Sequence, residues 1–260
     1  MELGLKNKIA LVTGSSRGIG RGTALALAAE GCDVMLTGRD EAALDEVAKE
    51  IQGKGRRAAT SVLDLRQPGA PEQLIAEVSR EFGGLDILVN NAGATKRGDF
   101  LTLTDADFED GFALKFFAHV RLVRAAWPLL MARRGSLVSI GGTGGRKPTA
   151  EFTIGSSVNA AVAAFSKCMA DRGKEDGVQV NCIHPSMVET DRLWKRIKAE
   201  MERTGWPEDK ARKEMCRGFG ITRFGTVEDV ADMIVFLVSS RASWMHGATI
   251  DLDGGEIPTL

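Results

Sequence analysis

The chain has 260 residues, and its 34 Lys and Arg against 35 Asp and Glu give a formal net charge of -1. This balance excludes the strongly basic class of proteins that hold nucleic acid through a general positive field. The longest apolar runs, such as residues 234–238 (IVFLV), are far too short to cross a bilayer. With Glu2 in place of a basic leader and a strand-like run soon after it, we expect a cytoplasmic protein without nucleic-acid or membrane partners.

Three residue types narrow the chemistry. Tyrosine is absent, which excludes any mechanism built on a tyrosine acid or nucleophile. The cysteines show no C-x-x-C spacing and the histidines no H-E-x-x-H spacing, so we predict no metal site. The cysteines have apolar neighbours, and we expect them to be reduced core residues. These residues are Cys32, Cys168, Cys182 and Cys216, and His119, His184 and His246.

Strands and helices alternate along the chain. Short apolar runs predict strands at residues 8–13, 33–37, 58–63, 86–90, 136–140, 178–184 and 248–252. Periodic or alanine-rich segments predict helices at about 21–30, from an Asp40 cap to about 52, at 71–82, 105–132 and 156–172, and from a Thr226 cap to about 239. Gly31 is the expected stop of the first helix.

This alternation predicts an α/β fold: a doubly wound, Rossmann-like parallel sheet of about seven strands with helices on both faces. We find no linker or internal repeat, so residues 1–260 are predicted to be one domain. The polar segment 188–220 follows the sixth strand. Since ligands bind at the carboxyl ends of such strands, it is predicted to be a substrate-side flap. The alternative is a solvated helical excursion.

A glycine-rich turn follows the first strand. Residues 13–20 read TGSSRGIG, with Gly14, Gly18 and Gly20 between a predicted strand and a predicted helix. Glycines there let a pyrophosphate approach backbone N–H groups and the positive end of the helix dipole. The spacing is G-x-x-x-G-x-G, and the Lys-Ser/Thr of a P-loop is missing. The turn predicts a dinucleotide site, and a turn without a ligand is the alternative.

The residue after the second strand indicates which dinucleotide binds. An NAD site places Asp or Glu there to hold the ribose 2′-OH. This chain has Arg39, with Arg17 in the glycine turn, and two guanidiniums can clamp a 2′-phosphate. We therefore predict NADP(H) as the cofactor. The adjacent Asp40 keeps NAD open, and both arginines can also be ordinary surface charges.

Six segments together resemble the short-chain dehydrogenase/reductase family. They are residues 13–20, Asp64, NNAG at 90–93, VNCIHPSMVETD at 180–191, TVEDVADMIVFLVS at 226–239 and GATIDLDGG at 247–255. The resemblance implies that Asp64 contacts adenine, that Asn90, Ala92 and Gly93 line the adenine-ribose side, and that Thr190 meets the nicotinamide carboxamide. The implied cofactor site comprises Gly14, Ser16, Arg17, Gly18, Ile19, Gly20, Arg39, Asp64, Asn91, Ala92, Gly93, Pro185 and Thr190. Ser186 departs from the family's Pro-Gly after the sixth strand.

The family's catalytic positions are occupied by other residues. The family uses Asn, Ser, Tyr and Lys, and alignment places Lys115, Gly142, Gly155 and Asn159 at these four positions. The chain is therefore predicted to be an atypical member that lacks the tetrad. Lys115 is the leading catalytic candidate, reaching into a pocket emptied by Gly142 and Gly155. Burial would lower its pKa and suit it to be an acid or an electrostatic anchor. Its alternative role is packing, with the ammonium in solvent.

Other polar residues border the same predicted pocket. Arg146 and Lys147 follow the fifth strand and are available to hold an anionic substrate, although a solvated loop is the alternative. His184 ends the sixth strand and is either titratable near neutrality or bonded to backbone. His119 lies one turn beyond Lys115, where packing is its expected role.

Three functions remain open at this point. The first is an NADP(H)-dependent oxidoreductase that transfers hydride to or from a small carbonyl or alcohol, with Lys115 or a water supplying the proton. The second is an isomerase or lyase with Lys115 as base or amine. The third is a non-catalytic nucleotide-binding sensor or scaffold. Family members usually form dimers or tetramers, so the resemblance implies a homodimer or homotetramer.

Overall fold

Seven parallel strands form the central sheet of the protein. The computed structural model describes residues 2–258. The strands run in the order β3-β2-β1-β4-β5-β6-β7, and every neighbouring pair is parallel. They are β1 (Ile9–Thr13), β2 (Asp33–Gly38), β3 (Ala58–Val62), β4 (Ile87–Asn90), β5 (Ser136–Ile140), β6 (Gln179–Pro185) and β7 (Thr249–Leu252). The predicted doubly wound Rossmann-like sheet is confirmed, with its order reversing between β1 and β4.

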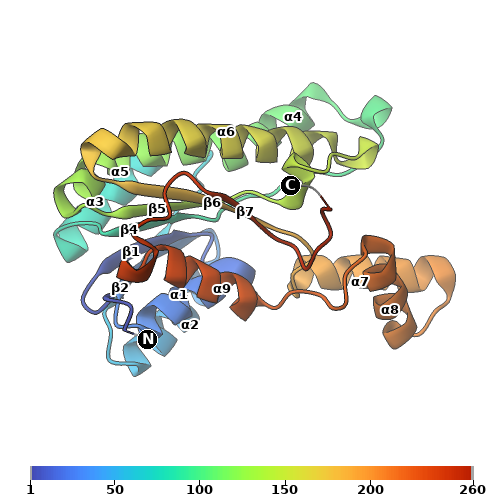
Figure 1. The fold of residues 1–260 in the computed structure, drawn as a ribbon, viewed down its shortest axis with the longest axis horizontal. Coiled ribbons are helices and arrows are strands. Elements are labelled where there is room, and N and C mark those ends of the chain that lie inside the picture. The colour runs from blue at the N-terminus through green and yellow to red at the C-terminus, as the bar shows by residue number, and fades with distance from the viewer. Residues whose placement is uncertain (1, 259–260) are drawn as a thin grey trace.

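Helices cover both faces of the sheet (Figure 1). One face carries α1 (Gly18–Ala29), α2 (Glu41–Gly53) and α9 (Val227–Leu237). The other carries α3 (Ala70–Phe82), α4 (Asp105–Phe112), α5 (Ala118–Arg133) and α6 (Thr153–Asp176). Separate apolar cores fill the two layers, one around Leu36, Ile51 and Ile234 and one around Leu74, Leu88 and Leu122. The strands are apolar on both faces because both are buried.

Local signals set most helix ends. The Asp40 side chain accepts a hydrogen bond from the Ala43 backbone N–H at 3.1 Å, so the predicted cap of α2 is confirmed. Thr226 forms a capping box with Asp229 at the start of α9. Gly31 has φ +90° and follows the end of α1. These ends agree with the sequence prediction because each depends on one or two neighbouring residues.

Two predicted helices differ from the structure. The helix predicted at 105–132 is interrupted by a π-helical turn, η2 (Ala113–Phe117), which widens the helix at Lys115. The helix predicted at 156–172 begins earlier, at Thr153, and runs to Asp176. Short 3₁₀ turns complete the chain: η1 (Phe100–Thr102), η3 (Thr143–Gly145), η4 (Ala150–Phe152) and η5 (Ser240–Ala242).

The segment after β6 folds as two helices, α7 (Asp191–Thr204) and α8 (Glu208–Phe219). Figure 1 shows this helix pair projecting beyond the end of the sheet. A small core of its own, formed by Leu193, Ile197, Ile221 and Phe224, holds it together. The segment is therefore an ordered unit, and we refer to residues 188–224 as the flap.

The cysteine prediction is wrong for two of the four residues. Cys32 and Cys182 are buried, but Cys168 is exposed and Cys216 is half-buried. Cys168 lies on α6, where apolar sequence neighbours point to other faces of the helix. Burial raises the pKa of Cys32 to about 12 and that of Cys182 to about 11, so both thiols stay protonated at neutral pH.

The contact between α1 and α9 depends on a glycine. A Cβ on Gly22 would lie 2.1 Å from Val227 Cγ1, so the Val227 side chain of α9 packs directly on the Gly22 backbone of α1. We expect Gly22→Ala to lower the free energy of unfolding by about 1–3 kcal/mol through overpacking. Urea unfolding should show that Val227→Ala, which removes the clashing atom, recovers much of this loss in the double variant. Gly53→Ala has open space around it and should cost nothing; an equal loss there would refute the packing argument.

Candidate functional site

The glycine turn after β1 has the backbone that the sequence predicts. Gly14 has φ +64° and Gly18 has φ +54°, both in the left-handed region. A Cβ on Gly20 would lie 2.2 Å from the Gly14 carbonyl oxygen, so no side chain fits there. The turn is thus folded tightly on itself, and it directs the start of α1 toward the carboxyl edge of the sheet.

The first turn of α1 is open to an anion. Arg17 precedes the helix without making a side-chain cap, and the first turn holds no acidic residue. The free N–H groups and the helix dipole therefore face the edge of the sheet uncompensated by any described residue. Ser16 and Ile19 are half-buried beside them. This cradle fits a pyrophosphate, because anions bind at helix N-termini of this kind.

The end of β4 is tied to the glycine turn by side chains. Thr13 Oγ1 accepts hydrogen bonds from the backbone N–H groups of Asn91 and Ala92, both at 2.9 Å. Asn91 Nδ2 donates to the carbonyl oxygens of Thr13 at 2.8 Å and Gly14 at 3.2 Å. Asn91 thus shapes the cradle from behind. Thr13 does the same and was not predicted as a site residue, although its place before the first glycine was a signal.

Arg39 and Asp64 face each other at the ends of β2 and β3. Arg39 Nη1 lies 3.8 Å from Asp64 Oδ2, and the Arg39 side chain is 66% exposed. Asp64 is also paired with Arg66 at 3.3 Å. Asp64 can keep Arg66 as its partner, so the exposed Arg39 is free to turn toward an incoming anion.

Two predicted cofactor residues lie where β6 leads into the flap. Pro185 is the last residue of β6 and is buried opposite Leu252. Thr190 precedes α7, and its Cγ2 atom lies 3.3 Å from the place of a Cβ on Gly18. The flap therefore begins directly against the glycine turn.

Lys115 lies in the π-helical turn η2 and points into the protein. Its Nζ donates a 2.9 Å hydrogen bond to the Gly141 carbonyl oxygen. Its stem passes over Gly93, where a Cβ would lie 2.9 Å from Lys115 Cγ and Cδ. Desolvation lowers the pKa of Lys115 from 10.5 to about 7, and the positive charge of Arg192 adds to this shift. A π turn often marks a functional position in a helix.

The predicted pocket at Gly142 and Gly155 is filled. The Phe152 ring occupies the space over Gly155, where a Cβ would lie 2.0 Å from its Cζ atom. A Cβ on Gly142 would lie 3.0 Å from Asn159 Nδ2, and Asn159 is itself buried. The prediction of an emptied pocket is therefore wrong, because a ring three residues earlier in the chain folds back over the glycine.

Both histidines near Lys115 bind backbone carbonyl groups. His119 Nε2 lies 3.0 Å from the Ala92 oxygen, and burial lowers its pKa to about 4. His184 Nδ1 lies 2.7 Å from the Gly142 oxygen, and burial lowers its pKa as well. His119 is therefore neutral at pH 7, and it connects α5 to the loop after β4.

The predicted anion-binding residues after β5 already have carboxylate partners. Arg146 Nε lies 3.3 Å from Asp251 Oδ2, and Lys147 Nζ lies 3.6 Å from Glu256 Oε1. Their charges are compensated within the protein, which weakens the prediction that they hold a substrate. The sequence reasoning missed three arginines: Arg97, which lies over the Phe152 ring, Arg192, which binds the Gly93 oxygen, and Arg196, which contacts Met187. Arg192 and Arg196 are four residues apart on α7, and this spacing, which places both on one face of a helix, could have indicated them.

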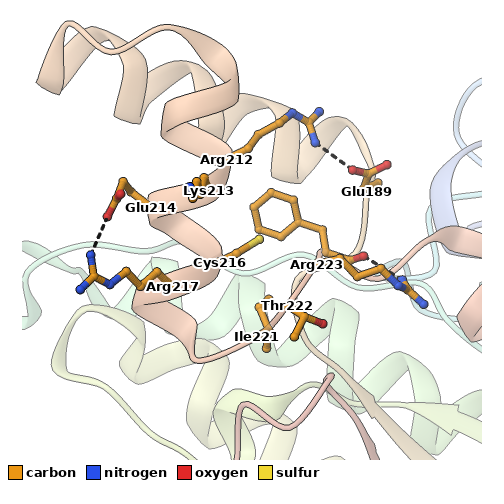
Figure 2. A pocket seen from close by; sticks show the side chains of 10 residues that line it. Glu189, Arg212, Lys213, Glu214, Cys216, Arg217, Ile221, Thr222 and Arg223 are labelled. Atoms are coloured by element: carbon orange, nitrogen blue, oxygen red, sulfur yellow. Dashed lines mark hydrogen bonds and ion pairs between the residues drawn. The ribbon is translucent and has the colours of Figure 1, made fainter.

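The flap also bears an open cavity of about 780 Å³. It lies between α8 and residues 221–224 (Figure 2), and Arg212 crosses it to Glu189 at 2.8 Å. Arg217 pairs with Glu214 at 3.8 Å on its rim. Its three arginines are held in ion pairs and none of the predicted site residues lines it, so it is not the candidate site. Within residues 2–258, no helix is long and apolar enough to span a bilayer, and no His, Cys, Asp and Glu cluster could hold a metal ion.

Known proteins share this fold and much of this sequence. A family model described as enoyl-(acyl carrier protein) reductase matches residues 14–256. The L-xylulose reductase of Mesocricetus auratus is 32% identical over 261 residues, with 100% of both chains covered.

Two solved structures are similar in the same way. L-sorbose reductase from Gluconobacter frateurii, complexed with NADPH and L-sorbose, has a TM-score of 0.96 at 32% identity, with 100% of each chain covered. A 3-oxoacyl (acyl-carrier-protein) reductase from Agrobacterium tumefaciens with NADP bound has a TM-score of 0.87 at 33% identity, covering 96% of this chain and 95% of that one. With a family model matching almost its whole length and a relative above 30% identity covered end to end, the chain belongs to the short-chain dehydrogenase/reductase family.

Proposed function

We propose that the chain is an NADP(H)-dependent oxidoreductase acting on a small carbonyl or alcohol, with Lys115 as the proton donor in place of tyrosine. The observation that carries the proposal is the position of Lys115. Its ammonium group is desolvated and fixed on the Gly141 oxygen, and its stem covers Gly93 beside the glycine turn. An acid with a pKa of about 7 can both give and take a proton near neutrality.

The cofactor would be held along the edge that joins β1, β2 and β4. The open start of α1 would bind its pyrophosphate, and Arg39 with Arg17 its 2′-phosphate. The family resemblance assigns adenine to Asp64 and the carboxamide to Thr190. The solved relatives complexed with NADPH and with NADP support this choice of nucleotide. When bound, the reduced cofactor supplies the hydride.

Lys115 and Asn159 have exchanged residue types relative to the family pattern. The family has Asn at the first position and Lys at the second, whereas this chain has Lys115 and Asn159. One ammonium group is thereby kept, moved from α6 to the turn η2. With no tyrosine in the chain, this ammonium or a water next to it would protonate the substrate oxygen.

A non-catalytic nucleotide sensor is the second candidate. It is favoured by the Phe152 ring, which fills the space over Gly155 at the family's tyrosine position. Both candidates require NADPH to raise the melting temperature, because a ligand of the folded state stabilises it. They differ in a panel of carbonyl compounds. Loss of the reduced-nicotinamide absorbance supports the oxidoreductase, and binding without any turnover supports the sensor.

The 2′-phosphate clamp predicts a difference between two nucleotides. Arg39→Asp should weaken NADPH binding about tenfold to hundredfold, the worth of a charge-assisted hydrogen bond, and NADH binding far less. Calorimetric titration measures both affinities. Lys54→Asp makes the same charge change at the opposite end of α2 and serves as the control. Equal losses for NADPH and NADH in Arg39→Asp would refute the clamp.

The proton-donor role predicts a pH profile. Carbonyl reduction needs protonated Lys115, so kcat should fall as the pH rises through about 7. Lys115→Ala should lower kcat by about 100-fold or more, remove this inflection and leave NADPH affinity nearly unchanged. Lys174→Ala, at the far end of α6, is the control. If Lys115→Ala keeps the activity and the inflection, Lys115 only packs and the proton has another source.

Lys115 also predicts a pH dependence of stability that needs no substrate. The pKa of Lys115 is 10.5 in its ordinary, solvated form and about 7 in the folded protein. Between pH 7 and pH 10.5 the unfolded chain therefore binds more protons at this residue than the folded chain does. The wild type should therefore gain stability as the pH rises from about 7 to 10.5. Lys115→Met has no titrating group at this position, so it should be more stable than the wild type. The difference in free energy of unfolding should be largest below pH 7 and shrink as the pH rises above it. Urea unfolding at pH 6 and pH 9 measures the difference; an advantage that does not depend on pH would refute the lowered pKa.

A further inference from the structure

Three arginines, one in the loop after β4 and two on α7, have no carboxylate partner within ion-pair distance in the described part of the chain. Arg97 lies over the Phe152 ring, 3.8 Å from its centroid. Arg192 donates to the Gly93 carbonyl oxygen at 3.0 Å. Arg196 contacts Met187 Sδ at 3.0 Å. A ring, a carbonyl group and a thioether position these guanidiniums without neutralising them.

The charges of Arg192 and Arg196 act on Arg97. Desolvation lowers the pKa of Arg97, and the charges of Arg196 and Arg192 lower it further. Glu151 and Glu256 oppose this shift from a distance. Glu256 is already bound to Lys147 and Ser186. Like charges near one another are unfavourable unless an anion joins them.

The other arginines of the flap form ion pairs. Four of them are paired with carboxylates, as Figure 2 shows for Arg212 with Glu189. These four pairs are Arg203–Glu200, Arg212–Glu189, Arg217–Glu214 and Arg223–Asp229. Arg192 and Arg196 share the same flap and lie one helical turn apart on α7. Since carboxylates are plentiful on this flap, the missing partners single out these two residues.

Arg192 connects the unpaired arginines to the proposed proton donor. Arg192 is bonded to Gly93, and Gly93 lies against the Lys115 stem. Arg97 also lines an open cavity of about 520 Å³ between the loop after β4 and residues 150–151. Arg97 and Arg192 keep solvent access, and Arg196 is half-buried, so an incoming molecule can reach all three.

We propose that Arg97, Arg192 and Arg196 bind the carboxylate or phosphate of the substrate, so that the enzyme acts on an anionic carbonyl compound. This inference rests on the proposed function and names its substrate class. Guanidiniums bind such oxyanions through paired hydrogen bonds, which fixes orientation as well as affinity. The anion would hold the substrate by its charged end, with its carbonyl group directed to Lys115.

Variants of Arg97 and Arg196 test the site. Arg192 is set aside because the charge of Arg17, in the glycine turn, also acts on it. Arg97→Gln and Arg196→Gln should each lower kcat/KM about tenfold to hundredfold for a keto acid and for a ketose phosphate. Their kcat/KM for the uncharged amide and for the free ketose should stay within about threefold. Arg196→Lys should recover part of the loss, and Arg217→Gln, 83% exposed on α8, should change neither class.

A binding measurement separates this proposal from the proposed function. Inorganic phosphate and malonate are titrated into the full chain, with and without NADPH, and the melting temperature is followed. A rise that is lost in Arg97→Gln and Arg196→Gln but kept in Arg217→Gln supports the anion site, even if no carbonyl compound is reduced. No rise with either anion, or a rise unchanged in the two variants, overturns it. Equal kcat/KM values for neutral substrates and their anionic counterparts would also overturn it. If only phosphate or only malonate raises the melting temperature, that anion identifies the oxyanion that the site binds.

Discussion

The side chains of Thr13 and Asn91 join the ends of β1 and β4 where the strand order of the sheet reverses. Two backbone N–H groups meet the Thr13 hydroxyl, and the Asn91 amide meets two carbonyl oxygens of the glycine turn. The turn is thereby held from behind, and the start of α1 remains open in front. At a reversal of strand order the flanking loops separate, which leaves room for a ligand at the edge of the sheet. The other residues of the candidate site lie around this junction.

The neighbouring residues are placed by contact with that junction. Thr190 lies against Gly18, the Lys115 stem lies against Gly93, and Arg192 binds the Gly93 oxygen. A glycine at each contact lets another segment approach closely, so the flap, the turn η2 and the glycine turn meet over a few residues. A small displacement of the β1–β4 junction would therefore move the cofactor cradle, the proposed proton donor and the flap together.

The charged groups of the candidate site differ in how they are held. Lys115 lies in the π turn η2, where desolvation lowers its pKa to about 7. Arg146 and Lys147 are neutralised by carboxylates, whereas Arg97, Arg192 and Arg196 are held by uncharged groups. The fold that carries these groups has a TM-score of 0.96 to an L-sorbose reductase. Function depends on these local groups more than on the fold that carries them.

The alternation of strands and helices, the glycine turn and the helix caps at Asp40 and Thr226 could be predicted from the amino-acid sequence alone. Each of these depends on residues that are close in the chain, through apolar periodicity, backbone freedom or a local hydrogen bond. Alignment to the family pattern also singled out Lys115, but it did not predict the groups around it.

The groups that surround the candidate site follow from tertiary contacts and not from local sequence. Phe152 closes the space over Gly155, Asp251 and Glu256 neutralise the basic loop, and Cys168 faces solvent. Each outcome depends on atoms from segments brought together by folding, or on the face to which a side chain turns. Spacing along the chain does not encode these distances, and they determine which charges at the site remain free.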